Sequence, residues 1–252
     1  MTDPFSDVAA LPGVAAVADR ARKRVDGVMF ERVLLKRAAE VVAECRLEAA
    51  RSSAELEGAP ASLADLRSGT AFSLDSVGPV ASAAVRVAEE STHLVDVWSR
   101  APAQALARLH AVAAADLAGE PGRPRDDAEV HDRLRALLGL LVQPTTAPGV
   151  VVAAIVHGEL LALAPFGSRD GLVARAAWRL VLVSRGVDSK SVTVPEQGLV
   201  RLGRPAYAES LAAYRSSEPA GVAAWVAHCC AAIELGAARG LELCREVAAR
   251  SV

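Results

Sequence analysis

The amino-acid sequence predicts an all-α protein, and its composition carries the prediction. Alanine, the residue with the highest helix propensity, is very abundant along the chain. Aromatic residues, which favour β-strands, make up only 4% of the 252 residues. Apolar residues make up 52%, which is enough to build a substantial buried core.

The first long helix is expected over residues 26–58, because apolar residues recur along one side and Gly58 and Pro60 end it. Pro79 and Pro102 are expected to begin two further helices. The helices expected after the first are 63–67, 79–100, 102–117, 128–142, 149–163, 172–184, 205–214 and 219–250. Loops are expected over 69–76, 119–127 and 143–149, and a short extended piece over 191–196. We expect residues 26–252 to form one helical domain, preceded by a partly mobile segment over 1–25.

Charge and cysteine content exclude several classes of protein. The net charge is −2 with 23% charged residues, which argues against a dedicated nucleic-acid binder. The N-terminus lacks the pattern of a signal peptide, and apolar stretches such as 150–156 are too short to span a bilayer. Four cysteines occur without a CxxC spacing, so we expect neither a zinc site nor a disulfide framework. These features predict a cytoplasmic protein with reduced thiols.

The segment between two of the expected helices is the main candidate site. Helices 149–163 and 172–184 are apolar almost all round, which is typical of helices at the centre of a domain. The loop between them contains two glycines and precedes a helix start, an arrangement that favours anions. Arg175 on the second helix needs a partner, because an unpaired buried charge is costly. Two interpretations stay open: an anion site, or a tight turn whose arginine is neutralised by an acidic side chain.

Residues 164–175, APFGSRDGLVAR, resemble the Fic (Fido) family motif H-P-F-x-[D/E]-G-N-G-R-x-x-R without gaps. Pro165, Phe166, Gly171 and Arg175 match the motif, and Asp170 stands where it has Asn. Three other segments resemble the family in the expected order. They are SAELEG at 53–58, PGRPR at 121–125, and His157 seven residues before Ala164.

The resemblance implies a Fic-like architecture with a degenerate catalytic loop. It implies an inhibitory-like helix over 26–58, a Fic core over about 78–200, and C-terminal helices over 205–250. In active Fic proteins the motif histidine is the general base, the acidic residue binds the metal, and the first arginine contacts the phosphates. These positions hold Ala164, Ser168 and Leu172 here. We therefore expect no intact catalytic group, no metal site, and lost or weak binding of Mg²⁺ and ATP.

What survives of the motif is its turn and its last arginine. The groups that could still contact an anion or nucleotide are Gly167, Arg169, Gly171 and Arg175. Ser53, Glu57 and Gly58 match the family's inhibitory signature, [S/T]-x-x-x-E-[G/N], whose glutamate pairs with the last motif arginine. The resemblance therefore predicts an ion pair between Glu57 and Arg175, and with transfer chemistry lost its expected role is structural. His157 is expected to be structural, and Asp170 to form the turn or cap the next helix.

Three functions fit the sequence. The first is a catalytically inactive Fic-like protein with a binding or regulatory role. The second is a Fic-fold transferase with altered chemistry that uses a nucleotide, nucleotide-sugar or other phosphorylated donor, and it requires an open pocket over the loop. The third is a helical adaptor or toxin–antitoxin component. We expect a protein partner or a second copy of the chain as the binding partner, and neither nucleic acid nor a membrane.

Overall fold

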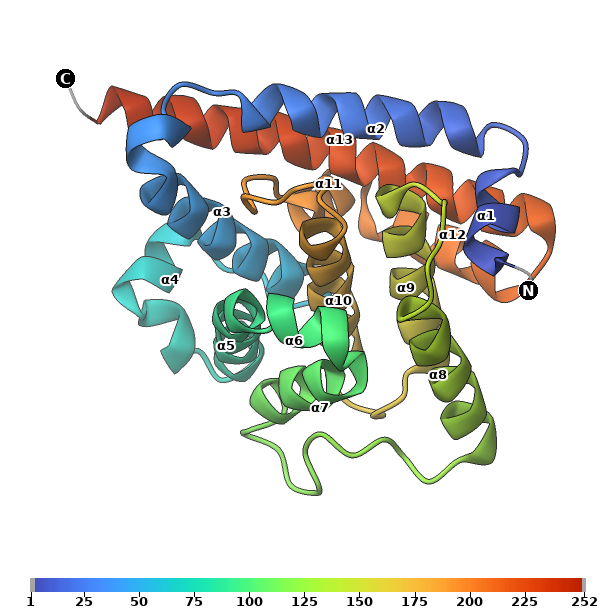
Figure 1. The fold of residues 1–252 in the computed structure, drawn as a ribbon. Coiled ribbons are helices and arrows are strands. Elements are labelled where there is room, and N and C mark those ends of the chain that lie inside the picture. The colour runs from blue at the N-terminus through green and yellow to red at the C-terminus, as the bar shows by residue number, and fades with distance from the viewer. Residues whose placement is uncertain (1–2, 251–252) are drawn as a thin grey trace.

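The computed structural model describes residues 3–250, and over these residues it contains helices and no strand (Figure 1). The predicted all-α class is therefore confirmed. The α-helices are α1 (Pro4–Ala9), α2 (Val14–Met29), α3 (Leu34–Leu56), α4 (Leu63–Ser68), α5 (Gly78–His93), α6 (Val95–Arg100), α7 (Pro102–Ala113), α8 (Ala128–Leu141), α9 (Gly149–Leu163), α10 (Asp170–Ser184), α11 (Pro195–Leu202), α12 (Arg204–Arg215) and α13 (Pro219–Ala249). One 3₁₀-helix, η1 (Thr70–Ser73), follows α4.

The centre of the molecule is the pair α9 and α10, whose faces are buried nearly all round. Helix α9 has the predicted bounds, and α10 begins two residues earlier than predicted. Helices α5, α6 and α7 pack against α10, while α13 packs against α9 (Figure 1). The loop between α9 and α10 therefore emerges at the edge of the core, where its shape is set by two rigid helices.

The N-terminal segment is part of the packed structure, so the expectation of a partly mobile segment over 1–25 is wrong for residues 3–25. Helix α2 lies along α13 (Figure 1), and buries Val14, Ala18, Ala21, Val25 and Val28 at helical spacing. The two alanines in this series let the helix backbones approach closely. The expected boundary between residues 25 and 26 falls inside α2. Residues 1 and 2 lie outside the part that the structure describes.

Several expected elements have different bounds in the structure, among them the helix expected over 102–117, which ends at Ala113. The helix expected over 26–58 is two helices, α2 and α3, separated at residues 30–33. The helix expected over 79–100 is divided into α5 and α6 at Leu94. The extended piece expected over 191–196 runs into α11, which begins at Pro195 and was not predicted. In each case packing against neighbouring helices sets a boundary that local periodicity does not show.

Helix α13 is long and apolar enough to cross a membrane by length and composition alone, which the sequence analysis did not anticipate. Its buried face contacts α2, α11 and α12 in the structure. A long helix in the core of a folded domain passes the same test, so this property is weak support for a membrane span.

Candidate functional site

The loop from Ala164 to Arg169 makes a tight turn that uses three left-handed residues. Ala164 has a φ of 43°, Gly167 of 72° and Arg169 of 55°. Glycine adopts this conformation readily, but alanine and arginine are strained in it. The strain is tolerated because the contacts described below hold the loop from several sides.

Arg125 fastens the loop to the end of α9. Its backbone N–H donates to the Pro165 carbonyl at 2.8 Å. Its guanidinium donates to the carbonyls of Ala164 at 3.1 Å and Leu163 at 3.0 Å. A cation at a helix C-terminus is also favourable, because the last carbonyls carry partial negative charge. The PGRPR segment, which the sequence analysis identified by its resemblance to the Fic family, therefore contributes Arg125, the residue that holds the loop.

The carboxylate of Asp170 accepts hydrogen bonds from backbone N–H groups of the turn. Its Oδ1 accepts a hydrogen bond from the Phe166 N–H at 2.9 Å, and the Gly167 N–H also donates to this carboxylate. Burial raises the pKa of Asp170 to about 6, although these two hydrogen bonds favour the charged form. The turn-forming role expected for Asp170 matches this geometry. The backbone donors of the expected anion site thus face a carboxylate of the chain itself.

The predicted ion pair between Arg175 and Glu57 is confirmed. Arg175 Nη2 lies 2.7 Å from Glu57 Oε1. The same guanidinium donates to Ser53 Oγ at 2.8 Å and to the Ser53 carbonyl at 3.1 Å. Only 2% of the Arg175 side chain is exposed, against 29% for Glu57. Burial lowers the pKa of Arg175, but Glu57 and Tyr207 outweigh this effect and raise it overall.

Gly171 is required at its position by the Glu57 carboxylate. A Cβ atom there would lie 2.1 Å from Glu57 Oε1 and 3.0 Å from Arg175 Nη1. Both are closer than van der Waals contact allows. The matching glycine of the motif therefore makes room here for the carboxylate of α3, so the expected anion position over Gly171 is filled.

Arg169 is neutralised by an aspartate that the sequence analysis did not single out. Its Nη2 lies 3.1 Å from Asp116 Oδ2, and Asp116 also accepts from Arg86 at 2.8 Å. The pairing joins the loop to the end of α7, and no local pattern marks Asp116 as its partner. Glu57 thus lies at Arg175 and Asp170 at the backbone donors of the turn, whereas the single carboxylate of Asp116 is shared between Arg169 and Arg86.

Ser168 and His110 lie together beside the loop, and this contact was also missed by the sequence analysis. His110 Nε2 is 3.2 Å from Ser168 Oγ, and the Gly122 N–H donates to His110 Nδ1 at 2.8 Å. The ring stacks on Phe166 with centroids 4.1 Å apart. Burial lowers the pKa of His110, so the ring is neutral. Because Nδ1 accepts a hydrogen bond, the proton is on Nε2, and His110 cannot accept the proton of Ser168.

His157 lies in the core between α9, α10 and α13. Its ring stacks on Trp178 with centroids 4.7 Å apart and lies 5.2 Å from that of Trp225. Its Nε2 is 2.7 Å from the hydroxyl of Tyr207, which in turn accepts a hydrogen bond from Arg175. Burial and the nearby Arg175 hold the pKa of His157 well below its usual value. The ring is therefore neutral and supports Arg175 from the side opposite Glu57.

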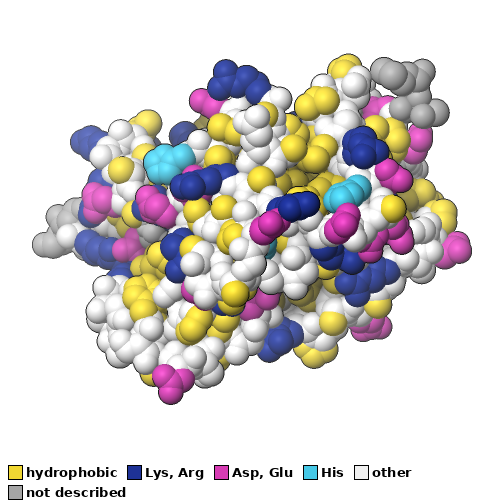
Figure 2. Space-filling view, turned by 90° about the horizontal axis from the view of Figure 1, so that it is seen from below, with side chains coloured by type: hydrophobic (Ala, Val, Ile, Leu, Met, Phe, Trp, Pro, Cys, Tyr) yellow, Lys and Arg dark blue, Asp and Glu magenta, His cyan; other side chains and the backbone are white. Residues whose placement is uncertain are grey.

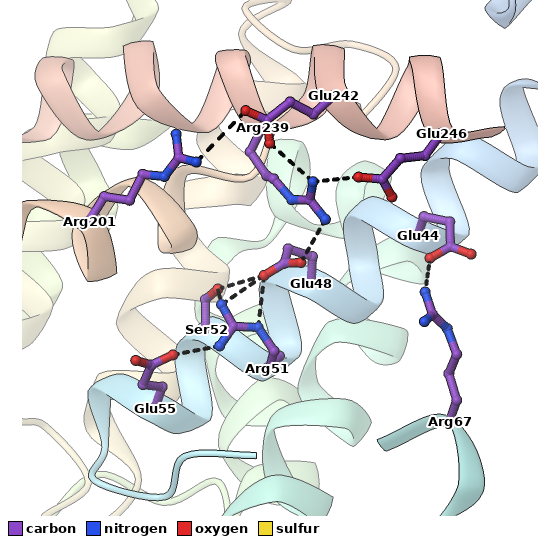
Figure 3. A network of polar contacts seen from close by, with 10 residues as sticks. All are labelled: Glu44, Glu48, Arg51, Ser52, Glu55, Arg67, Arg201, Arg239, Glu242 and Glu246. Atoms are coloured by element: carbon purple, nitrogen blue, oxygen red, sulfur yellow. Dashed lines mark hydrogen bonds and ion pairs between the residues drawn. The ribbon is translucent and has the colours of Figure 1, made fainter. Parts of the chain in front are cut away.

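The helix that carries Glu57 is fastened to the molecule at several points along its length (Figure 3). Glu48, with 4% of its side chain exposed, accepts from Arg51 at 2.8 Å and from Arg239 of α13 at 3.3 Å. Arg239 also pairs with Glu242 and Glu246, and Glu44 pairs with Arg67 of α4. These contacts hold α3 in place, so Glu57 sits on a rigid element.

The space next to the loop is not where the transferase alternative requires it. A hollow of about 380 Å³ is lined by His110, Phe166, Ser168 and parts of 114–126. An open donor pocket would be lined by residues 167–170 and by Arg175, and of these only Ser168 lines the hollow. On the face at the bottom of Figure 1, basic and acidic side chains are interspersed (Figure 2).

No family model and no curated protein sequence matches the chain. Solved structures do match it. A Fic family protein from Desulfovibrio desulfuricans G20 aligns with a TM-score of 0.74 and 18% identity, over 92% of this chain and 74% of that one. A fragment of Fic-1 from C. elegans aligns with a TM-score of 0.67 and 16% identity, over 94% of this chain and 75% of that one. A variant of that fragment aligns with a TM-score of 0.66 and 16% identity, over 91% and 71%. This chain therefore has the fold of the Fic proteins.

Proposed function

We propose that this chain is a catalytically inactive protein of the Fic fold that retains a binding or regulatory role. The main support for the proposal is that carboxylates of the chain itself lie at the polar groups of the loop between α9 and α10. The Glu57 carboxylate fills the position over Gly171 and neutralises Arg175, while Asp170 takes the backbone donors of the turn.

The loop also lacks a general base. The position of the motif histidine holds Ala164, whose methyl group cannot accept a proton. The two histidines nearest the loop do not replace it. His157 is fully buried and bound to Tyr207, and His110 presents a protonated nitrogen to Ser168. The carboxylate of Asp170 is held by the N–H groups of the turn.

A phosphate group would have to separate Glu57 from Arg175 before it could contact this arginine. Breaking a buried ion pair by removing one partner typically costs about 3–5 kcal/mol. The cost here is at the lower end, because Glu57 is partly exposed and Arg175 keeps its bonds to Ser53. Such a penalty reduces nucleotide affinity by about two orders of magnitude, since about 1.4 kcal/mol is a factor of ten.

Two assays on the full chain test the proposal. The first follows transfer of label from ATP carrying a labelled AMP group, with Mg²⁺, to the chain itself and to a protein mixture. The second measures the thermal shift with ATP. We expect no transfer by the wild type or by Glu57→Gly, and no ATP-dependent shift for the wild type. Glu209→Gly is the matched control, because Glu209 is an exposed glutamate without an ion pair on α12. Magnesium-dependent transfer by the wild-type chain would overturn the proposal.

A further inference from the structure

A second hollow lies away from the loop, between α8, α9, α12 and the first turn of α13. One half is apolar, has a volume of about 270 Å³, and is lined mainly by Phe5, Ala136, Leu140, Ile155 and Val222. The other half is polar and has a volume of about 250 Å³. Its polar lining residues are Arg133, Glu159, Tyr214, Arg215 and Ser217. Arg133, Glu159, Tyr214 and Val222 line both halves, so the two are continuous; we call them together the α8–α12 hollow.

The polar wall of the α8–α12 hollow is built around Glu159, the one acidic residue of the apolar helix α9. Glu159 Oε1 accepts from the Tyr214 hydroxyl at 2.7 Å, and Oε2 accepts from Arg133 Nη2 at 3.0 Å. Burial, together with Glu159, raises the pKa of Tyr214, so its hydroxyl stays protonated and remains a donor. Both oxygens of Glu159 are thus used to hold neighbouring side chains at the junction of the two halves.

The charges that line the hollow do not balance. Arg133 and Arg215 face one carboxylate, that of Glu159. Glu129 reaches Arg133 Nη1 at 3.3 Å, but its side chain is 75% exposed and does not line the hollow. Arg215 donates to the Leu161 carbonyl at 3.0 Å, and no carboxylate of residues 3–250 lies within ion-pair distance of it. Arg133 thus has two carboxylate partners, Glu129 and Glu159, and Arg215, whose side chain is exposed, is the cation of the polar half without a carboxylate partner among residues 3–250.

Ser217, at the rim of the polar half, is held in a strained conformation. Its φ is 59°, in the left-handed region that residues other than glycine rarely adopt. The short connection between α12 and α13 fixes it there, with Ser216 Oγ accepting from the Glu218 N–H at 3.3 Å. Strained residues of this kind occur preferentially at ligand sites, where the surrounding structure offsets the cost.

We propose that the α8–α12 hollow binds a small amphipathic anion, namely a carboxylate that carries a short acyl chain or an aromatic ring. The carboxylate contacts Arg215, because the planar guanidinium matches its two oxygens. The apolar tail lies between Phe5 and Ile155. The proposal does not depend on the inactivity of the Fic-fold loop.

Octanoate, acetate and octanol are the probes that test the proposal on the full chain. Titration calorimetry measures each affinity, and ligand-detected NMR confirms which part of octanoate is held. We expect octanoate to bind at least tenfold more tightly than acetate, which has only the head, and than octanol, which has only the tail. Arg215→Gln removes the cation without a carboxylate partner and is expected to weaken octanoate binding about tenfold. The Arg215→Gln variant loses the hydrogen bond to the Leu161 carbonyl and leaves the contacts among Arg133, Glu159 and Tyr214 in place.

The second variant is designed to fill the α8–α12 hollow. Ala136→Phe places a ring in the apolar half, and is expected to abolish octanoate binding while leaving the helical circular dichroism unchanged. Ala128→Phe is the matched control, because Ala128 is an exposed alanine two turns earlier on α8 that lines neither half. Absence of octanoate binding to the wild type would overturn the proposal. Equal affinity for acetate and octanoate, or unchanged octanoate binding by Ala136→Phe, would also overturn it.

Discussion

Arg175 and Arg179 lie one turn apart on α10, and each is buried against a carboxylate. Arg179 donates to both oxygens of Glu196, at 3.1 and 2.5 Å, and to the Thr193 carbonyl at 3.0 Å. Glu196 is only 17 residues away and 5% exposed. Glu57, the partner of Arg175, is 118 residues away, 29% exposed, and bonds the arginine through one oxygen.

The difference separates an architectural pair from one that a competitor can reach. The pair of Arg179 and Glu196 ties α10 to α11, with 11% of the Arg179 side chain and 5% of the Glu196 side chain exposed. The pair of Arg175 and Glu57 closes the loop region from α3, and one side of Glu57 faces water. In both pairs a carboxylate neutralises an arginine on an apolar helix, where an unpaired charge would be costly. Only the second lies beside the loop between α9 and α10.

The largest effect is expected from Glu196→Ala. This change leaves the buried Arg179 without its carboxylate, which typically costs about 3–5 kcal/mol of unfolding free energy. Glu57→Ala is expected to cost about 1–2 kcal/mol, because Arg175 keeps Ser53 and solvent reaches the vacated space. Urea denaturation of both variants measures the difference, with Glu209→Ala as a surface control. Equal losses for Glu196→Ala and Glu57→Ala would show that the two pairs do not differ as described.

Gly171→Ala tests whether Glu57 fills the space over the loop. The added methyl group clashes with Glu57 Oε1, so we expect a loss of about 1–3 kcal/mol of unfolding free energy. In a Glu57→Ala background the same substitution is expected to cost clearly less, because the clashing atom is gone. A double-mutant cycle by urea denaturation measures this coupling. If Gly171→Ala costs the same in both backgrounds, Glu57 does not occupy the position.

Tyr207→Phe probes the support of Arg175 from the side of α12. The variant removes a hydroxyl that bonds both Arg175 and His157, and we expect a loss of about 1 kcal/mol. Combined with Glu57→Ala, the loss should exceed the sum of the two single losses, because Arg175 then has only Ser53. Thermal denaturation of the four proteins provides the measurement. Strict additivity would mean that the two contacts act independently.

The smallest effect is expected in the pH dependence that Asp170 contributes. Burial raises its folded pKa to about 6 from the ordinary value of 3.8, so the native state holds this proton more tightly than the unfolded chain. The resulting stabilisation is full below about pH 4 and is lost as the pH rises through 6. Asp170→Asn lacks this titration, so its stability relative to the wild type should improve from pH 4 to pH 7. A stability difference that is constant between these pH values would contradict the raised pKa.

Local patterns in the sequence were sufficient for the centre of the fold. Helix α9 was predicted with its exact bounds because fifteen residues without a polar face lie between the turn at 143–149 and the glycine-containing loop that begins at residue 164. The pair of Glu57 and Arg175 could also be predicted, since both residues lie in segments that resemble the Fic family. The break between α2 and α3 could not, because the residues around Phe30 and Arg37 read as one continuous helix. Helix α11 was missed for a similar reason, since its bounds depend on packing against α13.

The sequence by itself determined the helical class, and its resemblance to the Fic motif indicated that Ala164 stands at the position of the motif histidine and that Arg175 matches the last motif arginine. These properties follow from composition and from residues close together in the chain. Only the tertiary structure decided that the loop is already occupied. The carboxylates of Glu57, Asp116 and Asp170 come from different segments, and only the packing of α3 and α7 beside the loop places the first two at its cationic groups. A charge is neutralised by whichever group lies near it in space, and the order of residues along the chain does not show that neighbour.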